Sequence, residues 1–387
     1  MSSDNSSLDR RDFLRKASAV SVALGTAGAA MAAPKASKSS SARSSGRVIG
    51  ANDRIAIGVI GVGGRGSSDA NSFARVGEKN NSCQIVAVAD TYQKRVNKNK
   101  ELHKCDGYLD YREILNRKDI DAVAICSPTD THAELIERAA RAKKAIFCEK
   151  PIDLHADRVR KCLDVVEATG ATLMVGFNRR FDHNFASLRS RIADGMIGEL
   201  EIVSITSRDR GPPPISYIAR SGGLFRDMMI HDFDMARFLL GEEPVAISAM
   251  GSALVDKAIG EAGDIDTAVV IMETKTGKVA QISNSRRAAY GYDQRVEAHG
   301  SKGMIRADNI RETSVEFAGA HGFSSDKALD FFLERYATAY RDELAAFVSA
   351  AAKGEKPRPD GEDGFQAIRL ADAAYLSWKT KERVEIG

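Results

Sequence analysis

The sequence is poor in the residues that build disulfide frameworks and metal sites. Five cysteines stand among 387 residues, and no two of them form a Cys-x-x-Cys pair. A dispersed, odd set of cysteines argues against a disulfide scaffold and against a zinc site. Cys126 and Cys148 fall in apolar, strand-like runs and are interpreted as buried small hydrophobic residues. The seven histidines are scattered without metal-ligand spacing, so we predict no bound metal.

A strong excess of either charge is also missing. The formal net charge of +3 divides into +1 for residues 1–33, +4 for 34–50 and −2 for 51–387. A nearly neutral folded part lacks the electrostatic footprint of a nucleic-acid-binding protein. The composition, 43% hydrophobic and 28% charged, is typical of a globular chain of about two domains.

The N-terminal apolar run, residues 17–33, is short and rich in Gly, Ala and Ser, so we predict no stable membrane span there. It follows the segment Arg10-Arg11-Asp12-Phe13-Leu14-Arg15-Lys16, which resembles a twin-arginine signal. We therefore predict a signal peptide over 1–33, a flexible linker over 34–50, and export to the periplasm by the twin-arginine translocase, which carries folded proteins. The alternative is a disordered basic tail on a cytoplasmic enzyme.

A nucleotide-binding turn comes directly after the first apolar strand. Residues 54–60 are mostly β-branched and apolar, and Gly61-Val62-Gly63-Gly64-Arg65-Gly66 leads directly into a helix-compatible stretch. In a Gly-x-Gly-x-x-Gly turn the first glycine permits the tight turn, the second lets the backbone approach a pyrophosphate, and the third allows close packing of helix on strand. We predict that Gly61, Gly63, Gly64, Arg65 and Gly66 bind a dinucleotide at the helix N-terminus.

The second strand, 84–89, ends in Asp90. An acidic residue at this place can bind the 2′-hydroxyl of an adenosine ribose, and it would repel a 2′-phosphate. We therefore predict NAD as the cofactor, with NADP possible because Lys94 and Arg95 are nearby. Asp90 is also a candidate N-cap of a helix over 92–103, and the two roles can coexist.

Strands and helices continue to alternate up to residue 175, with strands at 121–126, 145–148 and 171–175 and helices at 130–142 and 155–168. This pattern predicts an α/β, doubly wound parallel sheet, a Rossmann NAD(P)-binding domain over 51–175. Ligands of such sheets lie at the carboxyl ends of the strands. Ser127, Pro128, Glu149 and Lys150 lie at two such ends, so we predict cofactor contacts for them.

Lys150 is also a candidate for the chemistry. Its stem comes after an apolar strand, and a cis bond to Pro151 would aim its ammonium group. The alternative is a loop lysine that forms an ion pair with its neighbour Glu149.

The second half, 176–387, has a different pattern. A helix over 184–194 is followed by strand-like runs at 199–207, 244–252, 266–272, 278–284, 293–299 and 303–307, and then by helices over 330–353 and 363–381. Strands without intervening helices predict an α+β substrate-binding domain with a large, mostly antiparallel sheet. The last helices carry aromatic and apolar residues at helical spacing, which we interpret as core or subunit interface: Phe332, Tyr336, Tyr340, Leu344 and Phe347.

Asp227 and His231 are the second pair of chemical candidates. Four residues apart on a helix, they would share a face and touch. A carboxylate beside an imidazole suits proton transfer near neutral pH. The alternative is an amphipathic helix with a solvated His–Asp pair.

Several segments together resemble the Gfo/Idh/MocA oxidoreductases, and among them the inositol dehydrogenases, over residues 54–387. They are the glycine turn, Cys148-Glu149-Lys150-Pro151, and the segments 176–182, 221–240 and 284–295. The resemblance implies that Lys150, Asp227 and His231 are catalytic and contact the substrate. It implies substrate contacts for Arg179, which Arg180 adjoins, and for Tyr292, with Tyr290 and Asp293 nearby. It also implies a dimer or tetramer. The turn over 63–66 and the export signal look more like other branches of the family.

Three functions are left as hypotheses. The first is an NAD-dependent dehydrogenase that oxidises a ring hydroxyl of a cyclic polyol or sugar, most simply myo-inositol. The second is an exported sugar oxidoreductase or NAD-dependent glycosidase whose tightly bound cofactor is recycled internally. The third is a non-enzymatic sugar-binding protein, which is disfavoured because Lys150, Asp227 and His231 occur together.

Overall fold

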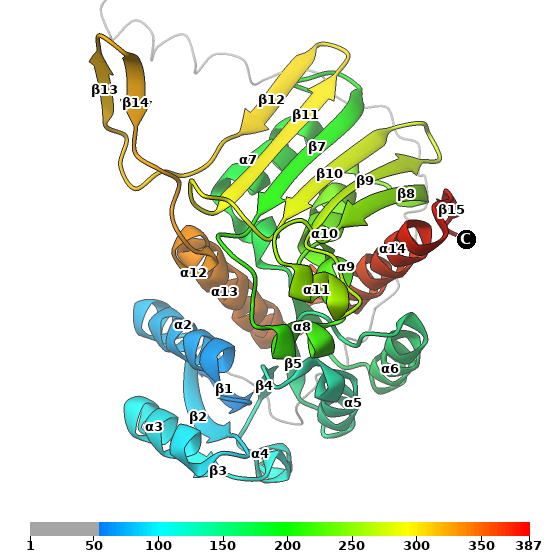
Figure 1. The fold of residues 1–387 in the computed structure, drawn as a ribbon. Helices are drawn as coiled ribbons and strands as arrows, with labels where there is room; N and C mark the ends of the chain where they lie inside the picture. The colour runs from blue at the N-terminus through cyan, green and yellow to red at the C-terminus, as the bar shows by residue number, and fades with distance from the viewer. Residues whose placement is uncertain (1–53) are drawn as a thin grey trace, which may run out of the picture. The chain divides into compact units, whose positions relative to one another are not determined.

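The computed structural model describes residues 54–387; the predicted signal and linker lie outside the described residues. The first half is built on sheet A, six parallel strands in the order β3-β2-β1-β4-β5-β6 (Figure 1). The strands are β1 (Ile55–Ile60), β2 (Cys83–Ala89), β3 (Asp106–Tyr108), β4 (Ala122–Ile125), β5 (Ala145–Glu149) and β6 (Leu173–Gly176). The central strands β1 and β4 are buried along their whole length, as expected for a sheet covered on both faces.

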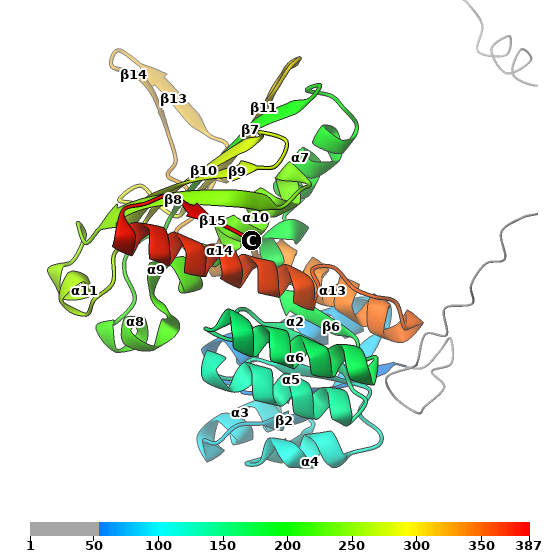
Figure 2. The same ribbon diagram turned by 90° about the vertical axis from the view of Figure 1, so that its right-hand side faces the viewer.

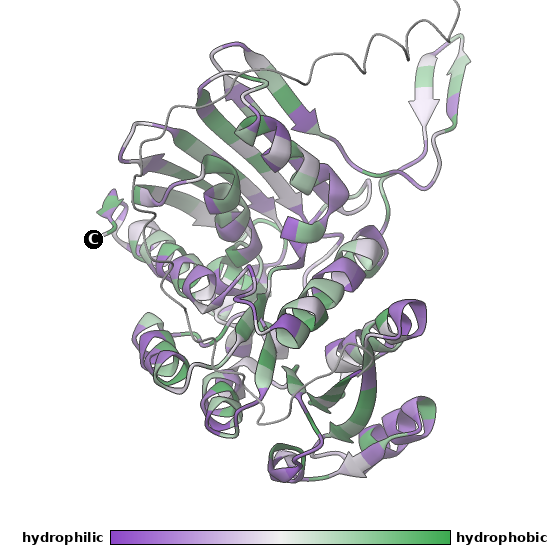
Figure 3. Cartoon of the chain, turned by 180° about the vertical axis from the view of Figure 1, so that it is seen from behind, coloured by the Kyte–Doolittle hydropathy of each residue, from purple (hydrophilic) through white to green (hydrophobic). Residues whose placement is uncertain are grey.

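Helices cover both faces of sheet A: α2 (Gly64–Asn80), α3 (Gln93–His103), α4 (Tyr111–Asn116), α5 (His132–Arg141) and α6 (Ala156–Thr169). One face packs apolar residues of α2 against the sheet, and the other packs those of α4, α5 and α6. In Figure 3 the strands are coloured as largely hydrophobic while the surrounding helices alternate in colour, the pattern of half-buried helices around a buried sheet.

The second half is built on sheet B, seven strands in the order β12-β11-β7-β10-β9-β8-β15. They are β7 (Leu200–Arg208), β8 (Pro244–Ser252), β9 (Thr267–Thr274), β10 (Val279–Ser285), β11 (Asp293–Gly300), β12 (Gly303–Ala307) and β15 (Val384–Glu385). Only the β7–β10 pair of this sheet is parallel, so the prediction of a mostly antiparallel sheet is confirmed. A separate hairpin, β13 (Glu316–Gly319) with β14 (Gly322–Ser325), extends from this half (Figure 1).

The helices of the second half are α7 (His183–Ala193), α8 (Ile215–Ser221), α9 (Gly223–Asp227), α10 (Ile230–Leu240), α11 (Lys257–Glu261), α12 (Phe332–Arg335), α13 (Ala337–Lys353) and α14 (Gly361–Thr380). The helix predicted over 330–353 is therefore divided at Tyr336. Figure 2 shows α10 and α14 between sheet B and the first half of the chain.

The last helices return to the first half. α13 packs on α2 and β1, and α14 packs on α6 and β6. Phe347 of α13 lies against Phe73 and Phe147, with ring centroids 6.3 and 5.8 Å apart. Because α13 supplies part of the core of the nucleotide-binding half, it ties the second half to sheet A, and residues of both halves line one cavity.

Candidate active site

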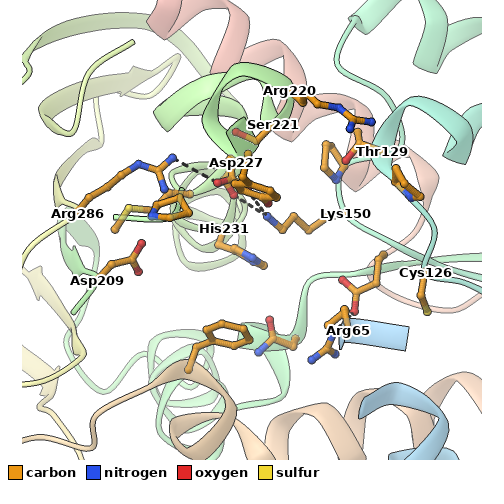
Figure 4. Close-up of a pocket in the computed structure, with 18 of the residues that line it drawn as sticks. Arg65, Cys126, Thr129, Lys150, Asp209, Arg220, Ser221, Asp227, His231 and Arg286 are labelled. Carbon is orange, nitrogen blue, oxygen red and sulfur yellow. Dashed lines mark hydrogen bonds and ion pairs between the residues drawn. The ribbon is translucent and has the colours of Figure 1, made fainter. Parts of the chain in front are cut away.

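A cavity of about 1420 Å³ lies where the carboxyl ends of β4 and β5 meet the second half. The first half contributes Arg65, the loop after β4 and the loop after β5; the second half contributes residues around α8, α9 and α10 and the start of α13. Figure 4 shows Lys150 reaching from one side toward Asp227 and His231 on the other. Ligands of a parallel sheet are expected at this edge.

The glycine turn is shaped for a phosphate. Gly61 has a left-handed backbone (φ +86°), and a Cβ there would lie 2.6 Å from the Ser127 nitrogen. A Cβ on Gly66 would lie 1.8 Å from the Gly61 oxygen, whereas one on Gly64 would meet nothing within 4 Å. The N-terminus of α2 has no side-chain cap and no acidic residue in its first turn. Its N–H groups are therefore open to an anion, and the turn fits the pyrophosphate of a dinucleotide.

Asp90 supports this turn directly. Its carboxylate accepts hydrogen bonds from the backbone N–H groups of Val62 and Tyr92, each at 3.0 Å, and forms an ion pair with Arg95 at 3.6 Å. The additional prediction of a helix cap is wrong, because Tyr92 is the N-cap residue of α3 and that cap has no side-chain hydrogen bond. Asp90 thus stands at the end of β2, where the adenosine ribose of NAD binds in this fold.

Arg65 faces inward. Its guanidinium donates to Glu149 at 2.6 Å, forms an ion pair with Asp69 at 2.5 Å, and stacks over the ring of Tyr340 at 3.6 Å. Glu149 is therefore paired with Arg65, and the predicted alternative of a Glu149–Lys150 pair is not what the structure shows. Cys126 also lines this side of the cavity, half-buried, and so departs from the prediction of a buried small hydrophobic residue; Cys148 is fully buried.

Lys150 points across to Asp227. The peptide bond from Lys150 to Pro151 is cis, as the sequence analysis suggested. The ammonium Nζ donates to the Asp227 backbone oxygen at 2.6 Å and lies 3.6 Å from its carboxylate. The same carboxylate accepts from Tyr217 Oη at 2.9 Å. It also accepts from Arg286 at 3.3 Å, a contact marked in Figure 4. Asp227 therefore holds a cluster of three donors from three separate parts of the chain.

The predicted contact between Asp227 and His231 is wrong. α9 ends at Asp227 and α10 begins at Ile230, so one continuous helix does not carry both residues. The N–H groups of Met228 and Met229 both donate to the Leu224 oxygen, which inserts an extra residue into the turn and rotates α10 relative to α9. Within residues 54–387 we find no hydrogen bond or ion pair between the two side chains.

His231 lines the cavity with a neutral ring. Burial, and then the positive charges of Lys150, Arg179 and Arg65, lower its pKa well below the ordinary value. Its Nδ1 is buried and has no hydrogen-bond partner among the described residues. The ring packs edge-on against Phe177, with centroids 6.0 Å apart. The lowered pKa keeps the imidazole neutral, so it has a lone pair that can accept a proton, while the neighbouring ammonium group opposes the charged form.

The structure separates the two adjoining arginines. Arg179 lines the cavity, donates to Asp232 next to His231, and donates to Ser207 at 3.3 Å. Arg180 instead binds Asp234, at 2.8 and 2.6 Å, outside the cavity. Arg179 is thus the arginine of the site, and its bond to Asp232 fixes the start of α10.

The predicted tyrosine also faces the cavity. Tyr292 is 6% exposed, lines the cavity and packs edge-on against Tyr336, with ring centroids 6.0 Å apart. Tyr290 and Asp293 do not line the cavity. The Tyr290 hydroxyl instead donates to the buried Asp293 carboxylate at 2.6 Å.

Several polar residues of the cavity were not predicted from the sequence, among them Asp209, Tyr217 and Arg286. Asp209 is half-buried, and burial raises its pKa to about 6. Their positions in the sequence gave a weak signal: Asp209 comes shortly before three consecutive prolines, and Arg286 lies in the segment 284–295, which carries the family resemblance. The prediction that the aromatic stripe is core is confirmed for Leu344, Phe347 and Tyr336, and Phe332 and Tyr340 pack against the core. Phe332, Tyr336 and Tyr340 also line the cavity.

Metal clusters and membrane-spanning helices are both missing from the described part of the chain. No cluster of three or more His, Cys, Asp or Glu side chains in residues 54–387 is arranged to hold a metal ion. Over the same residues, no helix has the length and apolar character needed to cross a membrane.

A parallel sheet in the order 3-2-1-4-5-6, a glycine turn open to phosphate, and a cavity at the strand ends define an NAD-binding oxidoreductase of the Rossmann class. The sequence comparisons agree. Residues 55–177 match the GFO/IDH/MocA oxidoreductase family with its NAD-binding Rossmann fold, and 185–306 match the GFO/IDH/MocA C-terminal domain. The chain belongs to the Gfo/Idh/MocA family.

Relatives within the family are named as inositol dehydrogenases. The inositol 2-dehydrogenase of Rhizobium meliloti (strain 1021) is 53% identical, over 86% of this chain and 99% of that protein. The crystal structure of a myo-inositol dehydrogenase from Corynebacterium glutamicum is 40% identical with a TM-score of 0.82, covering 86% of this chain and 99% of that one. A scyllo-inositol dehydrogenase from Lactobacillus casei, solved with NAD(H) and scyllo-inositol, is 27% identical with a TM-score of 0.80, covering 86% and 99%.

Proposed function

We propose that this protein oxidises a ring hydroxyl of a cyclic polyol, myo-inositol or a close relative, to a ketone with NAD. The observation that carries the proposal is the meeting of Lys150, from the nucleotide-binding half, with His231, from the other half, at one cavity. The inositol dehydrogenases among its relatives favour this function over an internally recycled cofactor and over a non-enzymatic role.

Each residue of the site has a separate task in this reaction. The glycine turn would hold NAD, which would supply the hydride acceptor. His231, neutral because its pKa is lowered, takes the proton of the reacting hydroxyl. Lys150 donates a hydrogen bond to the same oxygen as negative charge develops on it. Asp227 holds the Lys150 ammonium in place and does not orient the imidazole.

The substrate ring needs partners for its other hydroxyl groups. Asp209 lines the cavity with an acceptor, and Tyr217 and Arg286 bring donors to the same region. Arg179 stays bound to Asp232, so in this proposal it positions α10 and offers only its cavity-facing edge to the substrate. Several hydroxyl-binding groups around one acid–base pair suit a small ring with a hydroxyl on every carbon.

The test is an assay on purified protein, preceded by denaturation and mass identification of any released nucleotide. We expect an exchangeable NAD site and formation of NADH on addition of myo-inositol. If the protein carries stoichiometric nucleotide and reduces no added NAD, the captive-cofactor alternative is correct. If neither cofactor nor polyol gives turnover while polyol binds, the protein is a binding protein and the proposal fails.

We further propose that the protein assembles with copies of itself through the outer face of sheet B. The helices that pack on this sheet lie toward the first half of the chain (Figure 2). The opposite face presents Ile202, Val269, Ile271, Met250 and Met304 at 43 to 77% exposure. Met250 is paired with Val269 across neighbouring strands, so these side chains form a patch. A flat apolar patch of this kind is typical of a subunit interface.

Charging this patch is expected to halve the molecular mass or reduce it further. We predict that the Val269→Lys, Ile271→Lys double variant shifts from an oligomer to a smaller species in light scattering, because two desolvated ammonium groups oppose the contact. Leu102→Lys, which charges an exposed leucine on α3, is the matched control and should keep the mass. A wild-type monomer, or a double variant of unchanged mass, contradicts the proposal.

We also propose export by the twin-arginine translocase, on the strength of the segment Arg10 to Lys16 and of a family match that begins only at residue 55. Replacing Arg10 and Arg11 by lysine should leave the protein in the cytoplasm while wild type reaches the periplasm, because the translocase requires the arginine pair. Cell fractionation with an antibody to the folded part measures this. Equal distribution of the two forms would show that the segment is not a signal.

A further inference from the structure

His132 is a buried residue of the cavity wall that the proposed chemistry does not use. It opens α5, is 2% exposed, and places both ring nitrogens on backbone oxygens. Nδ1 lies 2.8 Å from the Pro151 oxygen, and Nε2 lies 2.7 Å from the Ser127 oxygen. One ring therefore contacts the loop after β4 and the loop after β5.

These two loops have different tasks. Ser127 begins the loop on the cofactor side, and it is held further by a 2.6 Å hydrogen bond between its hydroxyl and that of Thr131. Pro151 is the residue directly after Lys150, so the position of its carbonyl sets where the Lys150 backbone lies. β4 and β5 are paired only up to Ile125 and Cys148, where the loops diverge. Among the described residues, no other side-chain hydrogen bond joins the two loops.

The acceptors are carbonyl oxygens, so the ring must donate. The imidazolium form donates both bonds at once, and the neutral ring donates one or the other according to its tautomer. The carboxylates of Glu149, at the end of β5, and Asp130, in the turn before α5, favour the charged form. Burial is the larger effect and lowers the pKa of His132. The lowered pKa favours the neutral ring, and because a backbone oxygen lies within hydrogen-bond distance of each nitrogen, either tautomer finds an acceptor in this buried place.

We propose that His132 is a positioning residue that couples the cofactor loop to the catalytic lysine. A hydrogen bond donated by Nδ1 fixes the backbone that carries Lys150, and one donated by Nε2 fixes the Ser127 loop against the cofactor; the neutral ring makes one of the two at a time, according to its tautomer. The proposal rests on the proposed function for its catalytic half, while its cofactor half concerns NAD binding alone. Because small displacements of a catalytic group reduce turnover steeply, loss of one bond is measurable.

Two substitutions with amide side chains distinguish the Nδ1 hydrogen bond from the Nε2 hydrogen bond. The amide nitrogen of His132→Asn reaches the place of Nδ1, and that of His132→Gln reaches the place of Nε2. We expect His132→Asn to keep kcat within about threefold while NAD binds about fivefold more weakly, since a net hydrogen bond contributes about 1 kcal/mol. We expect His132→Gln to keep NAD affinity while kcat falls by about 10- to 100-fold. His132→Ala should show both losses.

The measurements are NAD titration without substrate and steady-state kinetics with myo-inositol, with thermal unfolding as the check on folding. His132→Ala with wild-type kcat and NAD affinity overturns the proposal. So does an identical profile for the Asn and Gln variants, which would show a purely structural ring. If His132→Ala fails to fold, the Asn and Gln pair still decides. If wild type oxidises no polyol, the proposed function fails, but the NAD titration still tests the cofactor half.

Discussion

Replacing Lys150 by methionine is expected to lower kcat by about a thousandfold, because one preorganised donor to a developing oxyanion supplies about 10²–10³ in rate and the local charge is lost with it. Methionine keeps the length and apolar stem of the side chain, so the cavity keeps its shape. The ammonium at present contacts only Asp227 among the described residues, through its backbone oxygen at 2.6 Å and its carboxylate at 3.6 Å.

NAD affinity of this variant should remain close to wild type, because the glycine turn, Asp90 and Ser127 are untouched. Lys161→Met, on the exposed side of α6, is the matched control and should keep full activity. NAD titration and steady-state kinetics with myo-inositol measure both quantities. Full turnover in the Lys150 variant would remove Lys150 from the chemistry; loss of NAD binding together with turnover would make it a cofactor residue only.

The nucleotide-binding half could be predicted because its signals are local. The Gly61–Gly66 turn, the acid at the end of β2 and the alternation of strand and helix each occupy a few consecutive residues, and the right-handed crossover rule converts that order into one parallel sheet. The strand order of sheet B could not be predicted in this way. β7 pairs with β10 and β11, and β15 returns beside β8 from the end of the chain, so those pairings depend on contacts between distant segments.

In the candidate site, too, local sequence signals were informative and contacts between distant segments were not. The family resemblance implied that Lys150, Arg179 and His231 belong to one site, and the structure places all three on the wall of one cavity. The rule that residues four apart on a helix share a face gave the wrong partner for Asp227. The N–H groups of Met228 and Met229 both donate to the Leu224 oxygen, and the extra residue in this turn breaks the i, i+4 relation between Asp227 and His231. Its partners in the structure are Tyr217, 10 residues away, and Lys150 and Arg286, 77 and 59 residues away along the chain. Residue spacing predicts side-chain contacts within one helix, but it cannot predict ion pairs between the two halves of the chain.

The aromatic stripe of the last helices shows how one pattern serves two purposes. Its apolar end, Leu344 and Phe347, packs into the core of the nucleotide-binding half. Its other end turns at Tyr336 and brings Phe332 and Tyr340 to the cavity. Helical spacing identifies a buried face but does not distinguish a core from a cavity wall, since both are apolar and enclosed.

Replacing His231 by asparagine is expected to lower kcat by about 10²–10⁴-fold, the usual contribution of a positioned general base. Asparagine keeps polarity and fits the space, but it cannot accept the proton. The direction of the pKa shift sets the pH dependence. Because burial and the neighbouring cations lower the pKa of His231 well below its ordinary value, the neutral form persists to low pH. Activity is then lost only as the pH falls through that lowered pKa.

Asp209 is the group that would obscure this profile, since burial raises its pKa to about 6 and it lines the same cavity. Asp209→Asn removes that titration and leaves the base in place, so an acid limb of kcat/KM near pH 6 that disappears in this variant belongs to Asp209. The limb that remains belongs to His231, and it should lie at lower pH. A limb that stays at or above the ordinary histidine pKa in Asp209→Asn, or substantial turnover in His231→Asn, would show that another group takes the proton.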